Sequence, residues 1–225
     1  MLPRNEDLKS PPALPHPHAG TPLLSMGSSL PDAKSALVLL HGRGASAEDM
    51  IGLAQAFVLP PGMTVLAPQA SGSVWYPQRF IAPLAANEPY LSSALRRVDE
   101  IITLLQENGL PAEQVIVGGF SQGACLAAEY VLRSQRRWGG LLAFSGGFIG
   151  PLGTLRQPTG RLDGTPVFLG CSDIDPHIPL ARFKETASLL EAMGAEVTAR
   201  IYPGMGHAIN QDEVDTAQAI VSGLG

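Results

Sequence analysis

The chain has 225 residues, 45% of them hydrophobic, and a formal net charge of −5. A chain of this length can bury one sizeable core, and a second full domain is hard to fit. Its basic residues are scattered, apart from a short cluster at 133–137 that complements the end of a predicted helix, which argues against nucleic acid as a partner.

The first 20 residues are predicted to form a flexible, proline-rich tail. They contain five prolines and few large apolar side chains, a composition typical of polyproline-like or disordered segments. His16 and His18 lie in this tail, but they lack the further ligands that a metal site needs. The remaining residues, 21–225, are predicted to form a single domain.

Beyond the tail, short buried-strand patterns alternate with helical patterns. The strands are predicted at 36–40, 64–67, 115–117, 141–144, 166–170 and 197–201, and the helices at 47–57, 92–107, 124–132, 180–193 and 212–223. This alternation predicts an α/β fold with a mostly parallel central sheet and helices on both faces. The segment at 71–90 is short, so no large lid domain is expected.

The chain shows no sequence signal for export or membrane insertion. Its first residues lack an apolar h-region and a cleavage site, and no later segment has enough uninterrupted apolar residues to span a bilayer. Two cysteines, Cys125 and Cys171, are too few for a disulfide framework. A cytoplasmic protein without a membrane span is the simplest prediction.

The sequence Gly-Phe-Ser-Gln-Gly at 119–123 lies between a predicted strand and a predicted helix. This is the order of a nucleophile elbow, in which a strained turn exposes the serine hydroxyl. The flanking positions must carry almost no side chain where the helix passes close to the strand, and Gly119 and Gly123 meet this requirement. An ordinary turn is the alternative, but the flanking elements favour Ser121 as a nucleophile.

Residues that follow the predicted strands supply partners for Ser121. In a parallel sheet, ligands bind outside the carboxyl ends of the strands. Those positions give, in chain order, Ser121, an aspartate at 173 or 175, and His207. This is the order of the α/β-hydrolase triad, with His207 as the general base. Spacing alone leaves Asp173 and Asp175 equivalent.

The loop after the strand at 36–40 is expected to complete an oxyanion hole. It reads His41-Gly42-Arg43-Gly44, and its glycines let the backbone approach a substrate. The backbone N–H groups of Arg43 and Gln122 are the predicted donors. The Arg43 side chain either contacts an acidic group of the substrate or reaches solvent, and we favour the second interpretation.

An aromatic stretch at 71–90 contains Trp75, Tyr76, Phe80 and Ile81. Such side chains either form the wall of an acyl pocket or cover the edge of the sheet. For Phe80 and Ile81 the two interpretations are even.

Several motifs together resemble a known family. They are Leu-His-Gly-Arg-Gly at 40–44, Trp-Tyr at 75–76, Gly-Phe-Ser-Gln-Gly at 119–123, Ser-Gly at 145–146, Asp-x-Asp-Pro-x-Ile-Pro at 173–179 and Tyr-x-Gly-Met-Gly-His at 202–207. From about residue 37 to its end, the chain resembles the phospholipase/carboxylesterase family of α/β-hydrolases, which includes acyl-protein thioesterases and small bacterial carboxylesterases. The resemblance implies an α/β-hydrolase fold. It also implies that Asp175, which directly precedes a proline, is the triad acid and that Asp173 supports it.

The resemblance extends to the pocket, with one departure. We expect His41, Trp75, Tyr76 and Met205 to line the substrate pocket, and the resemblance favours Trp75 in particular. Arg43 departs from the thioesterase-like members, which carry an apolar residue there, and this weakens a prediction of long acyl chains. No metal or cofactor is expected, and a homodimer is an open alternative because family members often form dimers.

These observations predict a serine hydrolase that cleaves carboxylic esters of small to medium soluble substrates through an acyl-enzyme intermediate. One alternative is a thioesterase, lysophospholipase or acyltransferase that uses the same triad. Another is a non-catalytic binding protein on a hydrolase fold, which is disfavoured because such a protein has no need of a triad and both oxyanion loops together.

Overall fold

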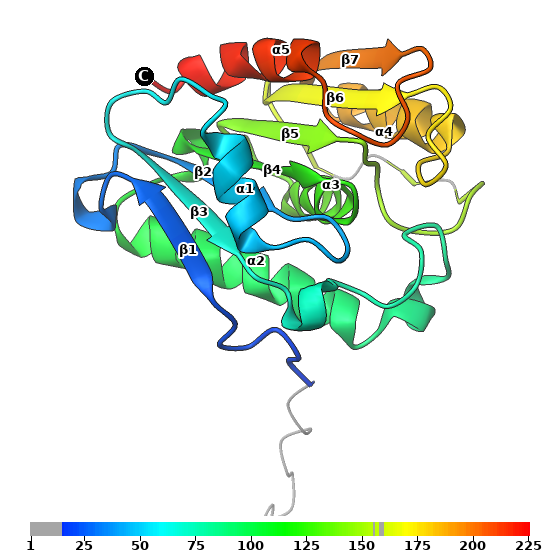
Figure 1. Ribbon diagram of the computed structural model, residues 1–225, viewed down its shortest axis with the longest axis horizontal. Helices are drawn as coiled ribbons and strands as arrows, with labels where there is room; N and C mark the ends of the chain where they lie inside the picture. Colours follow the sequence, from blue (N-terminus) through cyan, green and yellow to red (C-terminus); the bar gives the residue numbers. More distant parts are fainter. Residues whose placement is uncertain (1–14, 155, 158–159) are drawn as a thin grey trace, which may run out of the picture.

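The computed structural model describes residues 15–154, 156–157 and 160–225. Their strands form one seven-stranded sheet in the order β1-β3-β2-β4-β5-β6-β7 (Figure 1). The strands are β1 (Leu23–Gly27), β2 (Ser35–Leu40), β3 (Met63–Pro68), β4 (Val115–Phe120), β5 (Gly140–Phe144), β6 (Pro166–Ser172) and β7 (Glu196–Tyr202). β1 is antiparallel to β3, and every other neighbouring pair is parallel.

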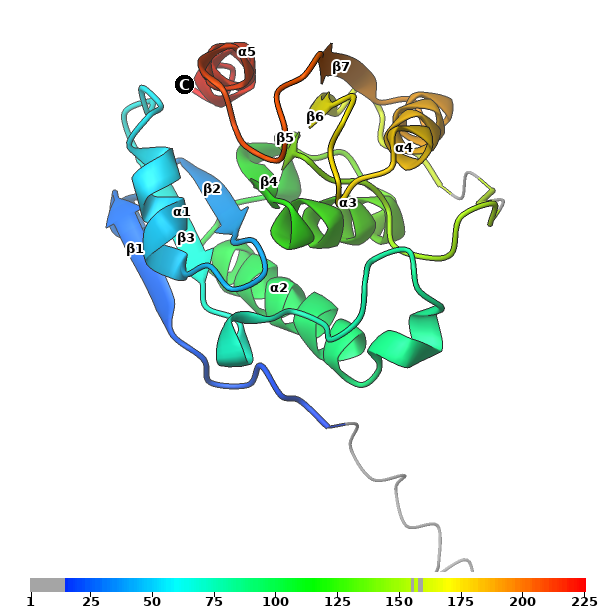
Figure 2. The same ribbon diagram turned by 45° about the vertical axis from the view of Figure 1, so that its right-hand side comes forward.

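The α-helices of the described residues cover both faces of the sheet (Figures 1 and 2). On one face lie α1 (Ala47–Ala54) and α5 (Gln211–Ser222), and on the other lie α2 (Tyr90–Glu107), α3 (Gln122–Ser134) and α4 (Leu180–Ala192). The predicted fold class, a mostly parallel sheet between two helical layers, is confirmed. Within the same described ranges, no helix is both long and apolar enough to cross a membrane.

β2 shows how the sequence builds two cores around the sheet. All six of its residues are buried, as expected of a central strand covered on both faces. Leu37 and Leu39 pack in the core beneath α1 and α5, while Val38 and Leu40 pack in the core beneath α2, α3 and α4. Because side chains alternate along a strand, the carboxyl end of β2 is held from both sides directly before the predicted oxyanion loop.

The edge strand β1 has no counterpart among the predicted strands. None of its five residues is buried, and two of them are exposed; it pairs with β3 alone. A short edge strand buries little apolar surface, so its sequence need not show the strong alternation or β-branched run that marks a central strand. Pairing with β3, rather than a local pattern, determines this element.

The start of the described chain packs against the domain, contrary to the predicted tail. His16 Nδ1 lies 2.7 Å from Ser93 Oγ, and His16 Nε2 lies 2.9 Å from Glu100 Oε1, with both partners on α2. The backbone N–H of His18 donates to the same Ser93 oxygen at 3.0 Å. The tail prediction is therefore wrong for residues 15–20, because these histidines bond to α2 despite the surrounding prolines. The rest of the predicted tail lies outside the described residues.

His18 is completely buried and links this segment to the loop after β3. Its Nε2–H donates to the Trp75 carbonyl oxygen at 2.9 Å, and its Nδ1 accepts from the Ser71 backbone N–H at 3.1 Å. The neutral imidazole uses both nitrogens, so a second proton would break one of these bonds. Burial is the main cause that lowers the pKa of His18 below its ordinary value.

We expect His18→Ala to lower the free energy of unfolding by about 3 kcal/mol near neutral pH, because it leaves a cavity and two unpaired backbone groups. Since the pKa of His18 is depressed in the folded state, its stabilising effect is present above the unfolded-state pKa of about 6.5 and is lost as the pH falls. Denaturant titrations above and below that value measure both effects, with His16→Ala as the control for loss of a less buried ring. A deficit that grows in acid would contradict this prediction.

Candidate active site

Ser121 lies at the junction of β4 and α3, with φ of 54° and ψ of −116°. A positive φ is uncommon for serine, so this turn is strained. An added Cβ at either Gly119 or Gly123 would collide with the carbonyl oxygen of Leu40 on β2. The elbow therefore passes so close to β2 that only glycine fits on either side of the serine.

Three side chains from three loops form a hydrogen-bonded chain. Ser121 Oγ lies 2.8 Å from His207 Nε2, and His207 Nδ1 lies 2.7 Å from Asp175 Oδ2. With a proton on Nδ1, the imidazole donates to the carboxylate and accepts from the serine hydroxyl. Ser121 follows β4, Asp175 follows β6 and His207 follows β7. The carboxyl edge of the sheet thus brings together the three residues that the sequence places at strand ends.

The two aspartates after β6 have different partners. The Asp175 side chain is fully buried, and its Oδ1 accepts two backbone N–H groups of its own loop at 2.8 and 3.0 Å while Oδ2 faces His207. Asp173 is exposed, and its Oδ1 accepts the Gly204 backbone N–H at 2.7 Å. Asp175 is therefore placed to orient the imidazole, and Asp173 holds the loop that carries it.

Two aromatic rings contact His207. The Phe120 ring centroid lies 4.8 Å from that of His207, and the His177 ring meets it edge-on at 4.7 Å.

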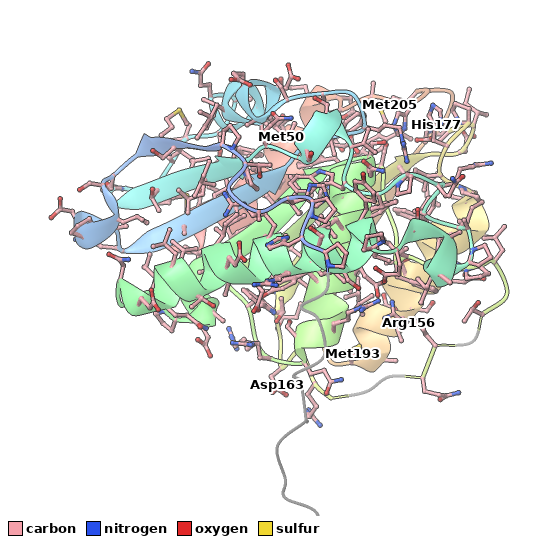
Figure 3. The ribbon with its side chains drawn as sticks, turned by 90° about the horizontal axis from the view of Figure 1, so that it is seen from below. Met50, Arg156, Asp163, His177, Met193 and Met205 are labelled. Atoms are coloured by element: carbon pink, nitrogen blue, oxygen red, sulfur yellow. The ribbon has the colours of Figure 1, made fainter. Side chains whose placement is uncertain are left out.

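Figure 3 shows His177 and Met205 at the same edge of the molecule, whereas Asp163 lies away from them. Asp163 precedes β6 and so lies at the amino end of the strands, which is why it cannot reach this histidine.

The loop after β2 approaches the nucleophile closely. A Cβ at Gly42 would lie 3.2 Å from the Phe120 ring and 3.5 Å from Ser121 Cβ. Among the described residues, the backbone N–H groups of Arg43 and Gln122 have no protein partner, and both residues line the cavity beside Ser121. Two donors are thus available for a developing oxyanion, one on the loop and one in the first turn of α3.

The Gln122 side chain fixes the loop that faces the elbow. Its Oε1 accepts the Trp75 backbone N–H at 2.9 Å, and its Nε2 donates to the Tyr76 carbonyl oxygen at 2.8 Å. That oxygen also accepts from Arg43 Nη2 at 2.8 Å. The two residues that offer oxyanion donors are therefore tied to one carbonyl group. Arg43 is exposed, as the favoured interpretation of its side chain expects, and its guanidinium is also bound to the cavity wall.

A cavity of about 400 Å³ opens beside the nucleophile. Tyr76 lines it, as predicted, and so does Phe80 from the same aromatic stretch, whereas Ile81 packs against the core. Met205 lies outside the lining, and its sulfur contacts the Asn210 side-chain amide at 2.8 Å. Lining residues that were not predicted for the pocket include Ala45, Pro77, Gln78, Arg79, Cys125, His177 and Ile178.

His41 and Trp75 lie behind the cavity wall and do not line it, contrary to the prediction. Both side chains are completely buried, and their rings lie 5.1 Å apart. Trp75 Nε1 donates to the His41 carbonyl oxygen at 2.9 Å, while His41 Nε2 accepts the Ala70 backbone N–H at 3.0 Å. Their polar atoms are satisfied by the protein itself, so they support the oxyanion loop rather than contact a substrate.

Cys125 lines the cavity one helical turn after Ser121, but it is not a second nucleophile. Burial raises the pKa of its thiol to about 12, so the thiol stays protonated at neutral pH. Burial likewise holds the pKa of the neighbouring Tyr76 phenol well above its ordinary value. These two groups therefore add no charge to the cavity.

Glu213 is a buried carboxyl group in the first turn of α5, the helix that follows the His207 loop. It forms a capping box with Asn210, in which each residue accepts the other's backbone N–H at 2.9 Å. Within the part of the chain that the structure describes, Glu213 Oε1 has no partner. Burial is the main cause that raises the pKa of Glu213 to about 7; the Asp212 charge adds to it, and the Asn210 N–H opposes it.

Glu213→Gln is expected to stabilise the protein by about 2 kcal/mol above neutral pH. The amide keeps an oxygen for the Asn210 N–H and has no charge to desolvate. A carboxyl whose folded pKa is raised destabilises the fold progressively as the pH rises from its unfolded-state pKa toward 7, so the gain should vanish below about pH 4.3. Thermal unfolding across this range measures it, and a gain that persists in acid would contradict the assigned cause.

Solved structures share this fold. A phospholipase/carboxylesterase from Dyadobacter fermentans has a TM-score of 0.85 and 40% identity, covering 90% of this chain and 96% of that chain. Esterase PE8 has a TM-score of 0.73 and 29% identity, covering 91% and 98% respectively. With Ser121 held at a strand-to-helix elbow, the chain is a serine hydrolase with the α/β-hydrolase fold.

Sequence comparison assigns the chain to a family within this class. A family model described as Phospholipase/Carboxylesterase matches residues 26–223, and the chain belongs to this family. Acyl-protein thioesterase 1 of Debaryomyces hansenii is 25% identical over 225 residues, covering 89% of this chain and 95% of that protein. Acyl-protein thioesterase 1 of Gibberella zeae is 32% identical over 117 residues, so the alignment spans 51% of this chain and 50% of that protein.

Proposed function

We propose that the protein hydrolyses carboxylic esters of small to medium soluble substrates, with Ser121 as nucleophile, His207 as general base and Asp175 as the residue that orients the imidazole. The observation that carries the proposal is the continuous hydrogen-bonded chain through His207, with distances of 2.8 and 2.7 Å. The adjoining cavity of about 400 Å³ supports a small or medium acyl group.

The proposed reaction has two halves. His207 Nε2 takes the proton from Ser121 Oγ as that oxygen attacks the ester carbonyl, and the backbone N–H groups of Arg43 and Gln122 stabilise the resulting oxyanion. The C–O bond to the alcohol then breaks, and the alkoxide takes the proton from His207, leaving an acyl-enzyme. Water, deprotonated by the same imidazole, attacks the acyl carbon. The bond between Ser121 Oγ and the acyl group then breaks, Ser121 Oγ takes the proton back from His207, and the acid is released. Asp175 stays ionised throughout and stabilises the imidazolium.

A thioesterase, a lysophospholipase or an acyltransferase would use the same residues, and the acyl-protein thioesterase relatives keep this alternative open. The Arg43 guanidinium in the cavity lining argues against a long apolar acyl chain, because a charged group would have to lose water against it. This observation favours hydrolysis of shorter, more polar esters.

Matched oxygen and sulfur esters test the proposed reaction. We expect 4-nitrophenyl butyrate to be hydrolysed with a larger rate enhancement than S-(4-nitrophenyl) thiobutyrate, each rate being divided by its uncatalysed rate. Adding methanol tests acyl transfer, since an acyltransferase would yield methyl butyrate in place of the acid. A larger enhancement for the thioester, or methyl butyrate as the main product, would replace this proposal by the alternative.

The small ester is the partner that the proposed reaction requires. The cytoplasmic location and the homodimer stay predictions.

A further inference from the structure

Two arginines line the cavity beside Ser121, although the chain as a whole has a formal net charge of −5. They are Arg43 and Arg79, and the lining contains no aspartate or glutamate. The carboxylate of Asp175 is fully buried, and both its oxygens accept hydrogen bonds from His207 and from backbone N–H groups. Among the described residues, neither oxygen forms an ion pair with an arginine.

Arg43 is fixed in place without using most of its donors. Its Nη2 donates to the carbonyl oxygens of Tyr76 at 2.8 Å and Gln78 at 2.9 Å. A guanidinium has five N–H donors, and those on Nε and Nη1 have no partner in the described ranges. Because the two carbonyls already hold the side chain, it loses less conformational entropy when it binds an anion.

Arg79 lies on the same loop as Tyr76 and Gln78 and connects it to the part of the cavity wall that contains His177. Its Nη2 donates to the His177 carbonyl oxygen at 3.3 Å. The loop that carries it is anchored by the buried Asn87, whose Oδ1 accepts the Gln78 N–H at 2.7 Å and whose Nδ2 donates to the Arg79 carbonyl oxygen at 3.3 Å. Seven other arginines pair with carboxylates within 4.0 Å, namely Arg96, Arg97, Arg133, Arg156, Arg161, Arg182 and Arg200. Among the described residues, neither Arg79 nor Arg43 has such a partner.

We propose that Arg43 and Arg79 form an anion subsite, and that the preferred substrate is an ester with a carboxylate or another anionic group near the scissile bond. The Arg43 backbone N–H faces the reacting carbonyl oxygen while its side chain lies on the cavity wall. One residue therefore contacts both the carbonyl oxygen and the anionic group of the substrate. Unpaired guanidinium donors match the geometry of a carboxylate. This inference rests on the proposed esterase function and adds the substrate class to it.

Paired esters test the subsite. Mono-4-nitrophenyl adipate places a carboxylate on the acyl group, and methyl 4-nitrophenyl adipate is its neutral counterpart. In the second pair, 3-carboxy-4-nitrophenyl acetate carries the carboxylate on the leaving group, and 4-nitrophenyl acetate is its neutral counterpart. We expect kcat/KM at low salt to favour at least one anionic ester by about tenfold over its counterpart, after correction for uncatalysed rates. The preference should shrink in concentrated salt, because ions screen exposed charges.

The variants assign the preference to residues. Arg79→Gln and Arg43→Gln should each reduce it by about threefold or more, mainly through the KM of the anionic ester. Arg79→Gln is the decisive change, because Arg43 also belongs to the oxyanion loop. Arg161→Gln removes the same charge at a side chain that is 78% exposed and should leave the preference unchanged.

The results that would contradict the anion subsite differ from those that would contradict ester hydrolysis. Equal kcat/KM within both pairs, with turnover that depends on Ser121, would overturn the anion subsite and leave ester hydrolysis standing. No turnover of any of the esters by folded protein would overturn both proposals. A preference that survives in Arg79→Gln and Arg43→Gln would overturn the assignment to these arginines.

Discussion

Ser121→Ala is expected to lower kcat for ester hydrolysis by about 10⁵-fold or more. The change removes the oxygen that lies 2.8 Å from His207 Nε2 and that would form the acyl-enzyme. Residual turnover would come from substrate binding and the oxyanion donors, which do not need the hydroxyl group. Hydrolysis of 4-nitrophenyl acetate and covalent labelling by a fluorophosphonate measure the loss: labelling should disappear, and hydrolysis should fall to this residual level.

Ser145→Ala is the matched control for this change. Ser145 follows β5 at the same edge of the sheet, is buried and has a positive φ of 53°. Within the described residues its hydroxyl group has no hydrogen-bond partner, so it lacks a base to activate it. We expect its activity to stay within about threefold of the wild type. Undiminished labelling of folded Ser121→Ala would show that another residue is the nucleophile.

The elements that carry the site could be predicted from the sequence because their patterns are local. β2 and β4 are buried on both faces and read as short apolar runs, and the elbow between β4 and α3 needs glycine at 119 and 123 for steric reasons. The order of residues after successive parallel strands then determines which side chains meet at the carboxyl edge. Ser121 and His207 follow from these two rules alone.

Contacts between distant segments determine the features of the site that could not be predicted from the sequence. Spacing leaves Asp173 and Asp175 equivalent, because their difference lies in whether the carboxylate meets His207 or a backbone N–H of the β7–α5 loop. Trp75 reads as a pocket aromatic, yet it is buried against His41 and His18. The apolar character of a side chain indicates that it is buried, whereas the packing of several loops decides whether a cavity forms beside it.

Asp175→Asn is expected to lower kcat by about 10⁴-fold. Asparagine keeps an oxygen for the backbone N–H groups of its loop, but it presents an amide N–H to His207 in place of a carboxylate oxygen. His207 would then carry its proton on Nε2, where it cannot accept the proton of Ser121. The loss should appear in kcat and in slower fluorophosphonate labelling, with the unfolding midpoint showing that the variant is folded.

Asp173→Asn makes the same chemical change two residues away and is the paired control. The Asp173 side chain is exposed and accepts the Gly204 N–H at 2.7 Å, a bond that an asparagine oxygen accepts equally well. We expect its activity to stay within about threefold of the wild type. A larger loss here than in Asp175→Asn would reverse the two assignments, and equal losses would mean that loop geometry rather than imidazole orientation limits the rate. The pair therefore separates a carboxylate that must be charged from one that need only supply an oxygen.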